Sequence, residues 1–103
     1  MNSNKTTTKS VLSERHSNPQ NDILLSYTLY EEQNSEENLG KFLMYSILIA
    51  CKTTKNSDDI LLQDVSRDKG KALEMFNIFA SNDVDPCTAP YIMDELLSQD
   101  EFL

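Results

Sequence analysis

The side chains that most often carry out reactions in proteins are scarce in this sequence. His16 is the only histidine, and it lies in a polar N-terminal stretch where nothing is expected to position it as a base. Cys51 and Cys87 have neither the close pairing nor the histidine partners of a zinc site. Gly40 and Gly70 are the only glycines, so neither common phosphate-binding loop is present. We therefore predict no catalytic residue, no metal site and no cofactor, and interpret the chain as a non-enzymatic protein.

Carboxylates, in contrast, are concentrated in the last third of the chain. Residues 72–103 contain seven acids and no Lys or Arg. Apolar residues recur between these acids at helical spacing, which indicates a folded acidic surface. Such a surface attracts a basic one, and salt weakens the attraction. The candidate partner-binding residues are Glu74, Asp83, Asp85, Asp94, Glu95, Asp100 and Glu101.

The overall charge narrows the classes of partner. The formal net charge is −8, which disfavours direct binding to nucleic acids and to anionic membranes, because both are themselves negative. A protein with a basic surface remains a candidate partner, and so does a simpler explanation in which the acidity only serves solubility. The sequence shows no apolar signal segment, and its longest apolar stretch, residues 42–50, is about half the ~20 residues of a spanning helix. We expect a cytoplasmic protein with two free thiols.

The elements that position these residues are predicted from periodicity. Residues 1–20 are polar and are expected to form a disordered arm, followed by a single domain over residues 21–103. Apolar residues alternate from 23 to 29, which indicates a strand, and the polar residues 31–41 are expected to form a loop. Residues 42–51 are apolar on both faces, as in a central strand that is covered at least in part on both sides. Residues 60–65 are a short third strand.

Two helices are expected to follow the strands. Asp68 is a plausible N-cap for a helix whose apolar face is formed by residues 72–80, and Asn82 is expected to end it in a left-handed conformation. Pro86 after Asp85 indicates the first position of a second helix. The order predicts an α+β fold, with a three-stranded antiparallel sheet followed by two helices packed on one face.

The sequence over residues 22–97 resembles a small clostridial and Firmicutes family of unknown function. The motifs that carry the resemblance are Tyr45-Ser46-Ile47 in a strand, Val65-Ser66 at a turn, Val84-Asp85-Pro86 at a corner and Asp94-Glu95-Leu96-Leu97 in a closing helix. The chain departs from the family pattern at Ser46, where Gly is usual, and at Thr88-Ala89, where His-Leu is usual. These motifs imply a fold and say nothing about activity.

Two functional interpretations follow. In the first, the acidic helical side covers the basic, nucleic-acid-binding surface of a partner protein and excludes the partner's substrate by mimicking DNA. Small acidic inhibitors of CRISPR nucleases are similar in size, charge and general build. In the second, the chain is a bacterial regulatory or structural domain that acts through an apolar sheet face, formed by Phe42, Met44 and Leu48, or through homodimerisation.

Overall fold

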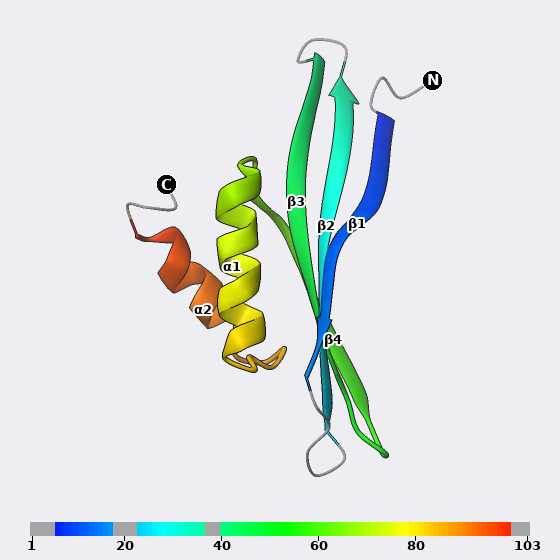
Figure 1. The fold of residues 1–103 in the computed structure, drawn as a ribbon, viewed down its shortest axis with the longest axis vertical. Coiled ribbons are helices and arrows are strands. Elements are labelled where there is room, and N and C mark those ends of the chain that lie inside the picture. Colours follow the sequence, from blue (N-terminus) through cyan, green and yellow to red (C-terminus); the bar gives the residue numbers. More distant parts are fainter. Residues whose placement is uncertain (1–5, 18–22, 37–39, 100–103) are drawn as a thin grey trace.

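One antiparallel sheet with two helices on one of its faces makes up the described part of the chain (Figure 1). The structure, a computed structural model, describes residues 6–17, 23–36 and 40–99. The strands lie in chain order, β1-β2-β3-β4. Their bounds are β1 (Thr6–His16), β2 (Leu24–Glu36), β3 (Gly40–Lys52) and β4 (Ser57–Ser66), and the helices are α1 (Lys69–Ser81) and α2 (Ala89–Leu97). The predicted α+β class is confirmed, but the sheet has four strands instead of three.

The additional strand lies in the segment that was predicted to be disordered. Residues 6–16 form β1, which pairs with β2 from Thr6↔Ser35 to His16↔Ser26, so the predicted disordered arm is wrong for these residues. The sequence of β1 is polar because β1 is an edge strand that contributes little to the core: Val11 is 55% exposed, and Leu12 lies at a bulge in the pairing. Bulges and charged side chains on an edge strand hinder its pairing with other chains.

The hairpin formed by β2 and β3 is also longer than predicted. β2 continues through residues that were expected to form a loop, and its ladder with β3 extends to the pair Glu36↔Gly40. The backbone φ of Gly40 is 71°, a left-handed conformation that glycine adopts at little cost. Polar side chains dominate this end of the hairpin, so alternation of apolar residues could not reveal it. β4 likewise extends on both sides of the predicted residues 60–65.

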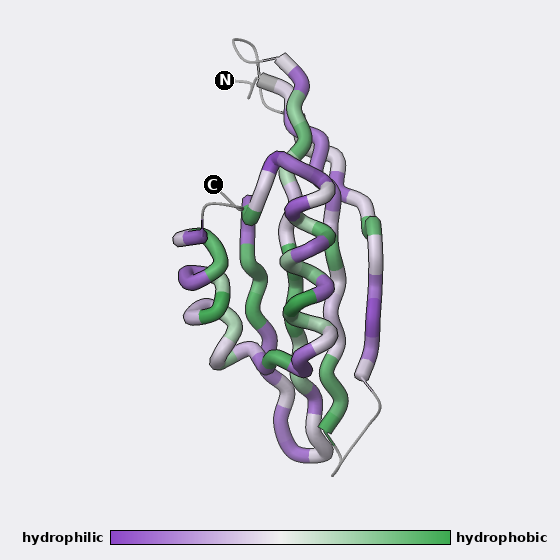
Figure 2. The backbone as a smooth tube through the Cα atoms, turned by 60° about the vertical axis from the view of Figure 1, so that its left-hand side comes forward, coloured by the Kyte–Doolittle hydropathy of each residue, from purple (hydrophilic) through white to green (hydrophobic). Residues whose placement is uncertain are grey.

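The core lies between the sheet and the two helices. Leu29, Ile47 and Ile49 on the sheet and Phe79 on α1 have no exposed surface. Figure 2 shows hydrophobic and hydrophilic residues alternating along α1, as expected for a helix that packs one side on the sheet. The predicted apolar face of α1 is confirmed by its buried residues, which are Ala72, Met75, Phe76, Phe79 and Ala80.

The ends of α1 were predicted in part. Asp68 is the N-cap, and its Oδ1 accepts the backbone N–H of Lys71 at 2.9 Å. The left-handed residue at the other end is Asp83, with a φ of 49°, and not Asn82, with a φ of −106°. Asn82 is instead the C-cap of α1, and its side-chain amide donates to the carbonyl of Ile78 at 2.7 Å.

The second helix begins later than predicted. Residues 86–88 form turns, and α2 starts at Ala89 with Pro90 in its first turn. Asp85 explains the delay, because its Oδ1 accepts the backbone N–H of Thr88 at 2.8 Å and closes a turn ahead of the helix. Within the described residues, no helix combines the length and apolarity that crossing a membrane requires.

Candidate functional site

The structure describes five of the seven acids that were predicted to bind a partner, and it leaves all five exposed. Glu74 lies on α1, and Asp83 and Asp85 lie in the connection between the helices. Asp94 and Glu95 lie on α2. Asp100 and Glu101 lie outside the described residues. The acids therefore come from three parts of the helical side.

The strongest concentration of acids follows the exposed side of α2. Tyr91, Asp94, Glu95 and Ser98 are exposed and stand at helical spacings of three and four residues. Within the described residues, neither Asp94 nor Glu95 takes part in an ion pair. The acidic surface is defined here as Asp83, Asp85, Asp94 and Glu95 together with Tyr91.

Tyr91 is the residue of this surface that the sequence did not identify. In the sequence, Tyr91 is expected to lie with Ile92, Met93, Leu96 and Leu97 on the apolar side of the second helix, yet 75% of its surface is exposed. Met93 and Leu96 are the side chains that α2 buries deeply. The available signal was the spacing of Tyr91 from Asp94 and Glu95, which puts the three residues on one side of a helix.

The acidic surface does not extend over α1, although the sequence suggested that it would. Lys69 is exposed in the first turn of α1. Arg15 from β1 reaches the outer side of the same helix, where its Nη1 donates to Oδ1 of Asn77 at 3.3 Å. Glu74 therefore shares α1 with basic groups supplied by the fold, which confines the uninterrupted negative charge to α2 and the connection before it.

The connection before α2 is fixed to the sheet by a buried hydrogen bond. The hydroxyl of Tyr27 on β2 donates to the backbone carbonyl of Val84 at 2.9 Å. Burial raises the pKa of Tyr27 to about 12, and the nearby Asp83 and Asp85 act in the same direction. The hydrogen bond between Asp85 and Thr88 lowers the pKa of Asp85. This connection therefore holds Asp85 as a charged, positioned group.

The opposite face of the sheet is the second candidate site. Strand pairing places Phe42, Met44 and Leu48 of β3 on the face that the helices leave uncovered, and each is only partly buried. Tyr30 on β2 and Leu61 on β4 flank them on the same face. The prediction that β3 is central is confirmed by its place between β2 and β4. The helices cover only one of its two faces.

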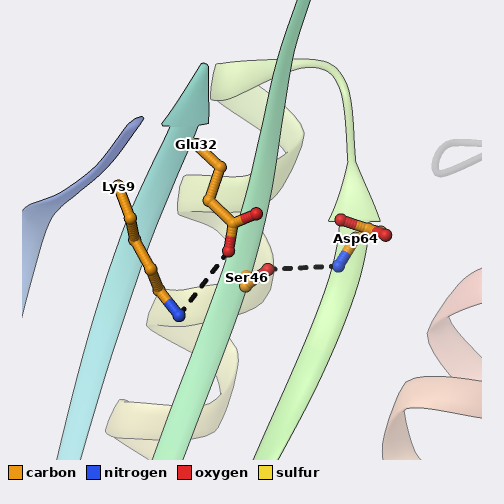
Figure 3. A network of polar contacts seen from close by, with 4 residues as sticks. All are labelled: Lys9, Glu32, Ser46 and Asp64. Carbon is orange, nitrogen blue, oxygen red and sulfur yellow. Dashed lines mark hydrogen bonds and ion pairs between the residues drawn. The ribbon is translucent and has the colours of Figure 1, made fainter. Parts of the chain in front are cut away.

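Polar contacts cross this open face (Figure 3). Lys9 lies 3.6 Å from Oε1 of Glu32, and its ammonium group stands 4.3 Å from the centre of the Tyr30 ring. Ser46 is fully buried, and its hydroxyl accepts the backbone N–H of Asp64 at 3.2 Å. Asp64 has a φ of 53° at a shift in the β3–β4 register. Ser46 thus stabilises a bulge at a position where the resemblance implied glycine.

A hollow of about 360 Å³ opens beside this bulge. At its rim, the guanidinium of Arg67 stacks 5.1 Å from the centre of the Phe42 ring. Within the described residues, Arg67 has no carboxylate partner in an ion pair. The hollow is lined by Glu32, Asn34, Phe42, Met44, Gln63, Asp64 and Arg67.

Residues with the chemistry of a metal or redox centre are not gathered in the described part of the chain. No group of three or more His, Cys, Asp or Glu side chains is arranged to hold a metal ion there. Cys51 is partly buried on β3, whereas Cys87 is exposed before α2, and both are free thiols. The two features that stand out are therefore surfaces: an acidic one around α2 and a partly apolar one on the sheet.

Comparison with known proteins identifies a family. No curated protein and no solved structure matches this chain. A family model matches residues 6–99, which includes β1 and therefore extends further towards the N-terminus than the motifs noted in the sequence. The chain belongs to this family, a family of unknown function designated DUF6514.

Proposed function

We propose that this protein is a non-enzymatic regulator that binds a partner protein through the acidic surface on α2 and the connection before it. The observation that carries the proposal is the exposure of Tyr91, at 75%, beside the exposed carboxylates of Asp94 and Glu95. Tyrosine is enriched among the residues that dominate binding energy at protein interfaces, because it buries a large area and keeps a polar hydroxyl.

The charge around Tyr91 supports a basic partner. Asp94 and Glu95 are consecutive residues of α2, so their Cα atoms are about 3.8 Å apart, well within the Debye length of about 8 Å at physiological salt. At this spacing their potentials reinforce each other in solution. Within the described residues, none of Asp83, Asp85, Asp94 and Glu95 is neutralised by an ion pair.

The finer part of the proposal is that the partner surface normally binds nucleic acid. Surfaces that bind DNA or RNA present Lys and Arg to phosphates. Carboxylates on a rigid scaffold bind the same Lys and Arg side chains. In that case the protein inhibits its partner by competition, as small acidic inhibitors of CRISPR nucleases do. Long-range attraction speeds the encounter, and added salt slows it.

The proposal is tested by capturing partners from an extract of cells that carry the gene. The baits are the wild-type chain, the double variant D94N/E95Q and the matched control D58N/D64N, which removes the same charge from β4. We expect the wild type and the control to retain the same basic protein, and D94N/E95Q and Y91A to lose at least about tenfold in affinity, since hot-spot truncations cost about 2 kcal/mol or more.

Two outcomes overturn parts of this proposal separately. If D94N/E95Q retains the partner as well as D58N/D64N does, the acidic surface is not the binding site. A second outcome is that D94N/E95Q fails to bind the purified partner, but duplex DNA does not displace the wild-type chain from that partner. In this case the surface binds a basic protein without mimicking nucleic acid.

A further inference from the structure

We infer that the open face of the sheet is a dimer interface that binds a second copy of this chain. Apolar side chains are exposed on this face. Val11 is 55% exposed in the middle of β1, and the half-buried side chains of Met44 and Leu48 lie on the same face of the sheet. Antiparallel sheets often keep one face towards solvent, but such a face is usually polar.

The charge of this face also suits association with a second copy. In a chain with a net charge of −8, two copies repel each other unless the surfaces that meet are close to neutral. Among the side chains that the structure describes, three basic and three acidic ones lie on or beside the open face, with Asp64 at the bulge as one further acid. The six are Lys9, Lys52, Arg67, Glu14, Glu32 and Asp59. The acidic surface on α2 has no such balance and is unsuited to self-association.

The arrangement of these charges along the strands is compatible with two-fold symmetry. Val11, Tyr30 and Ser46 form one row across the sheet. Lys9 lies on one side of this row, opposite Glu32 and Met44, and Glu14 lies on the other side, opposite Thr28 and Leu48. A two-fold axis that runs along this row, between two facing sheets, places the Lys9 side of one copy against the Glu14 side of the other.

Two copies related by this axis complement each other. Lys9 of each copy faces Glu14 of the other, and Met44 faces Leu48. Arg67, which stacks on Phe42 beyond Met44, faces Asp59, which pairs with Ala50 beyond Leu48. The guanidinium that lacks a carboxylate partner within the described chain therefore gains one. Val11 faces itself across the axis, and the strands of the two sheets run nearly aligned, as in β-sandwiches.

Sedimentation equilibrium over a range of protein concentrations tests the interface. The wild-type chain is expected to be a dimer. M44E is expected to weaken dimerisation at least about 100-fold, because an unpaired buried charge costs several kcal/mol. L43E is the matched control, since Leu43 is the neighbouring residue on β3, is 40% exposed and points to the opposite face. V11E is a second variant that places a charge at a 55% exposed site and so spares the fold.

The charge pair tests the direction of the axis. D59R and R67D are each expected to weaken the dimer about tenfold through repulsion of like charges, and the double variant D59R/R67D is expected to restore it. Circular dichroism establishes that every variant is folded. A wild-type chain that stays monomeric at all concentrations overturns the proposal, and so do equal effects of V11E and L43E. Failure of the double variant to recover overturns the two-fold arrangement. None of these outcomes depends on the acidic surface, so the proposed partner binding is tested separately.

Discussion

The two outer sides of this molecule differ in how their charges are used. On the helical side, the carboxylates of Asp94 and Glu95 have no ion-pair partner within the described residues. On the open sheet face, Lys9 pairs with Glu32 across two strands, and Arg67 stacks on Phe42. α2 and the connection before it therefore have a one-signed field that acts over distance, whereas the sheet face has local pairs and an apolar centre. Long-range attraction suits a basic partner, and short-range complementarity suits a second copy.

The difference also shows what a charge count alone misses. The net charge of −8 suggests a uniformly acidic protein, yet in the described residues the sheet and α1 carry acids and bases together, whereas α2 and the connection before it carry acids alone. The covered face provides the stability that both outer sides depend on.

Truncation of the covered face is expected to be far more costly than truncation of the open face. Phe79 has no exposed surface between α1 and the sheet, so F79A is expected to lower the free energy of unfolding by about 3–5 kcal/mol. L48A, on the open face, is expected to cost the monomer less than about 1 kcal/mol because its side chain is only partly buried. Urea denaturation, at concentrations where the chain is monomeric, measures the free energy of unfolding of both variants. Equal losses in F79A and L48A would contradict the assignment of a single core.

Removal of the Tyr27 hydroxyl is expected to loosen the attachment of the acidic connection to the sheet. Y27F leaves the buried carbonyl of Val84 without its 2.9 Å hydrogen bond, which costs about 1–3 kcal/mol. Amide hydrogen exchange is expected to increase at residues 82–88 in Y27F while the β2–β3 ladder keeps its protection. Unchanged exchange in this connection would show that the hydrogen bond does not hold it.

Alkaline pH is expected to weaken the same attachment. Burial raises the pKa of Tyr27 from its ordinary value of 10.0 to about 12, so the folded state holds the phenol proton more tightly than the unfolded state. The stabilisation is complete below pH 10 and is lost as the pH rises towards 12, with a loss on the order of 1 kcal/mol near pH 11. Y27F is expected to remove part of this pH dependence of the free energy of unfolding, which denaturation curves at pH 9 and pH 11 measure. Tyr45 is expected to account for the rest of the pH dependence, because burial and its hydrogen bond to Glu31 raise the pKa of Tyr45 as well.

The acids of the acidic surface are expected to differ in their structural roles. D85A removes the bond to the Thr88 N–H and is expected to cost about 0.5–2 kcal/mol, as the loss of a cap does. D94A is expected to change stability by less than about 0.5 kcal/mol, since this exposed side chain has no ion-pair partner in the described chain. Thermal unfolding compares the two. Because the pKa of Asp85 is lowered, the stabilisation by Asp85 is expected above pH 4 and is lost on further acidification.

The elements that bury a regular apolar pattern could be predicted from the sequence. The helical spacing of Ala72, Met75, Phe76 and Phe79 identified α1, and Asp68 identified its start. The alternation of Leu25, Tyr27 and Leu29 likewise identified the buried side of β2. β1 could not be predicted in this way, because an edge strand gains its structure from the ladder with β2 and contributes few buried side chains of its own.

The candidate site was predictable in its charges and not in its arrangement. The acids of α2 are visible in the sequence, but the approach of Arg15 to Asn77 requires the pairing of β1 with β2 and the position of α1. Tyr91 was misplaced because a short helix with many apolar residues has no unique buried side by periodicity alone. The hydrogen bond of Asp85 to Thr88 also displaced the start of α2 from Pro86 to Ala89, which local preferences for proline at helix starts did not anticipate.

Hydroxyl-radical footprinting of the purified chain over a range of concentrations tests the division between the two sides most directly, because it reads Met44 and Tyr91 in one experiment. Oxidation of Met44 is expected to fall as the concentration rises and copies associate through the sheet face, while oxidation of the 75% exposed Tyr91 is expected to remain constant. Met93, a buried residue of α2, provides the internal reference. Protection of Tyr91 with rising concentration, or constant oxidation of Met44, would contradict the account.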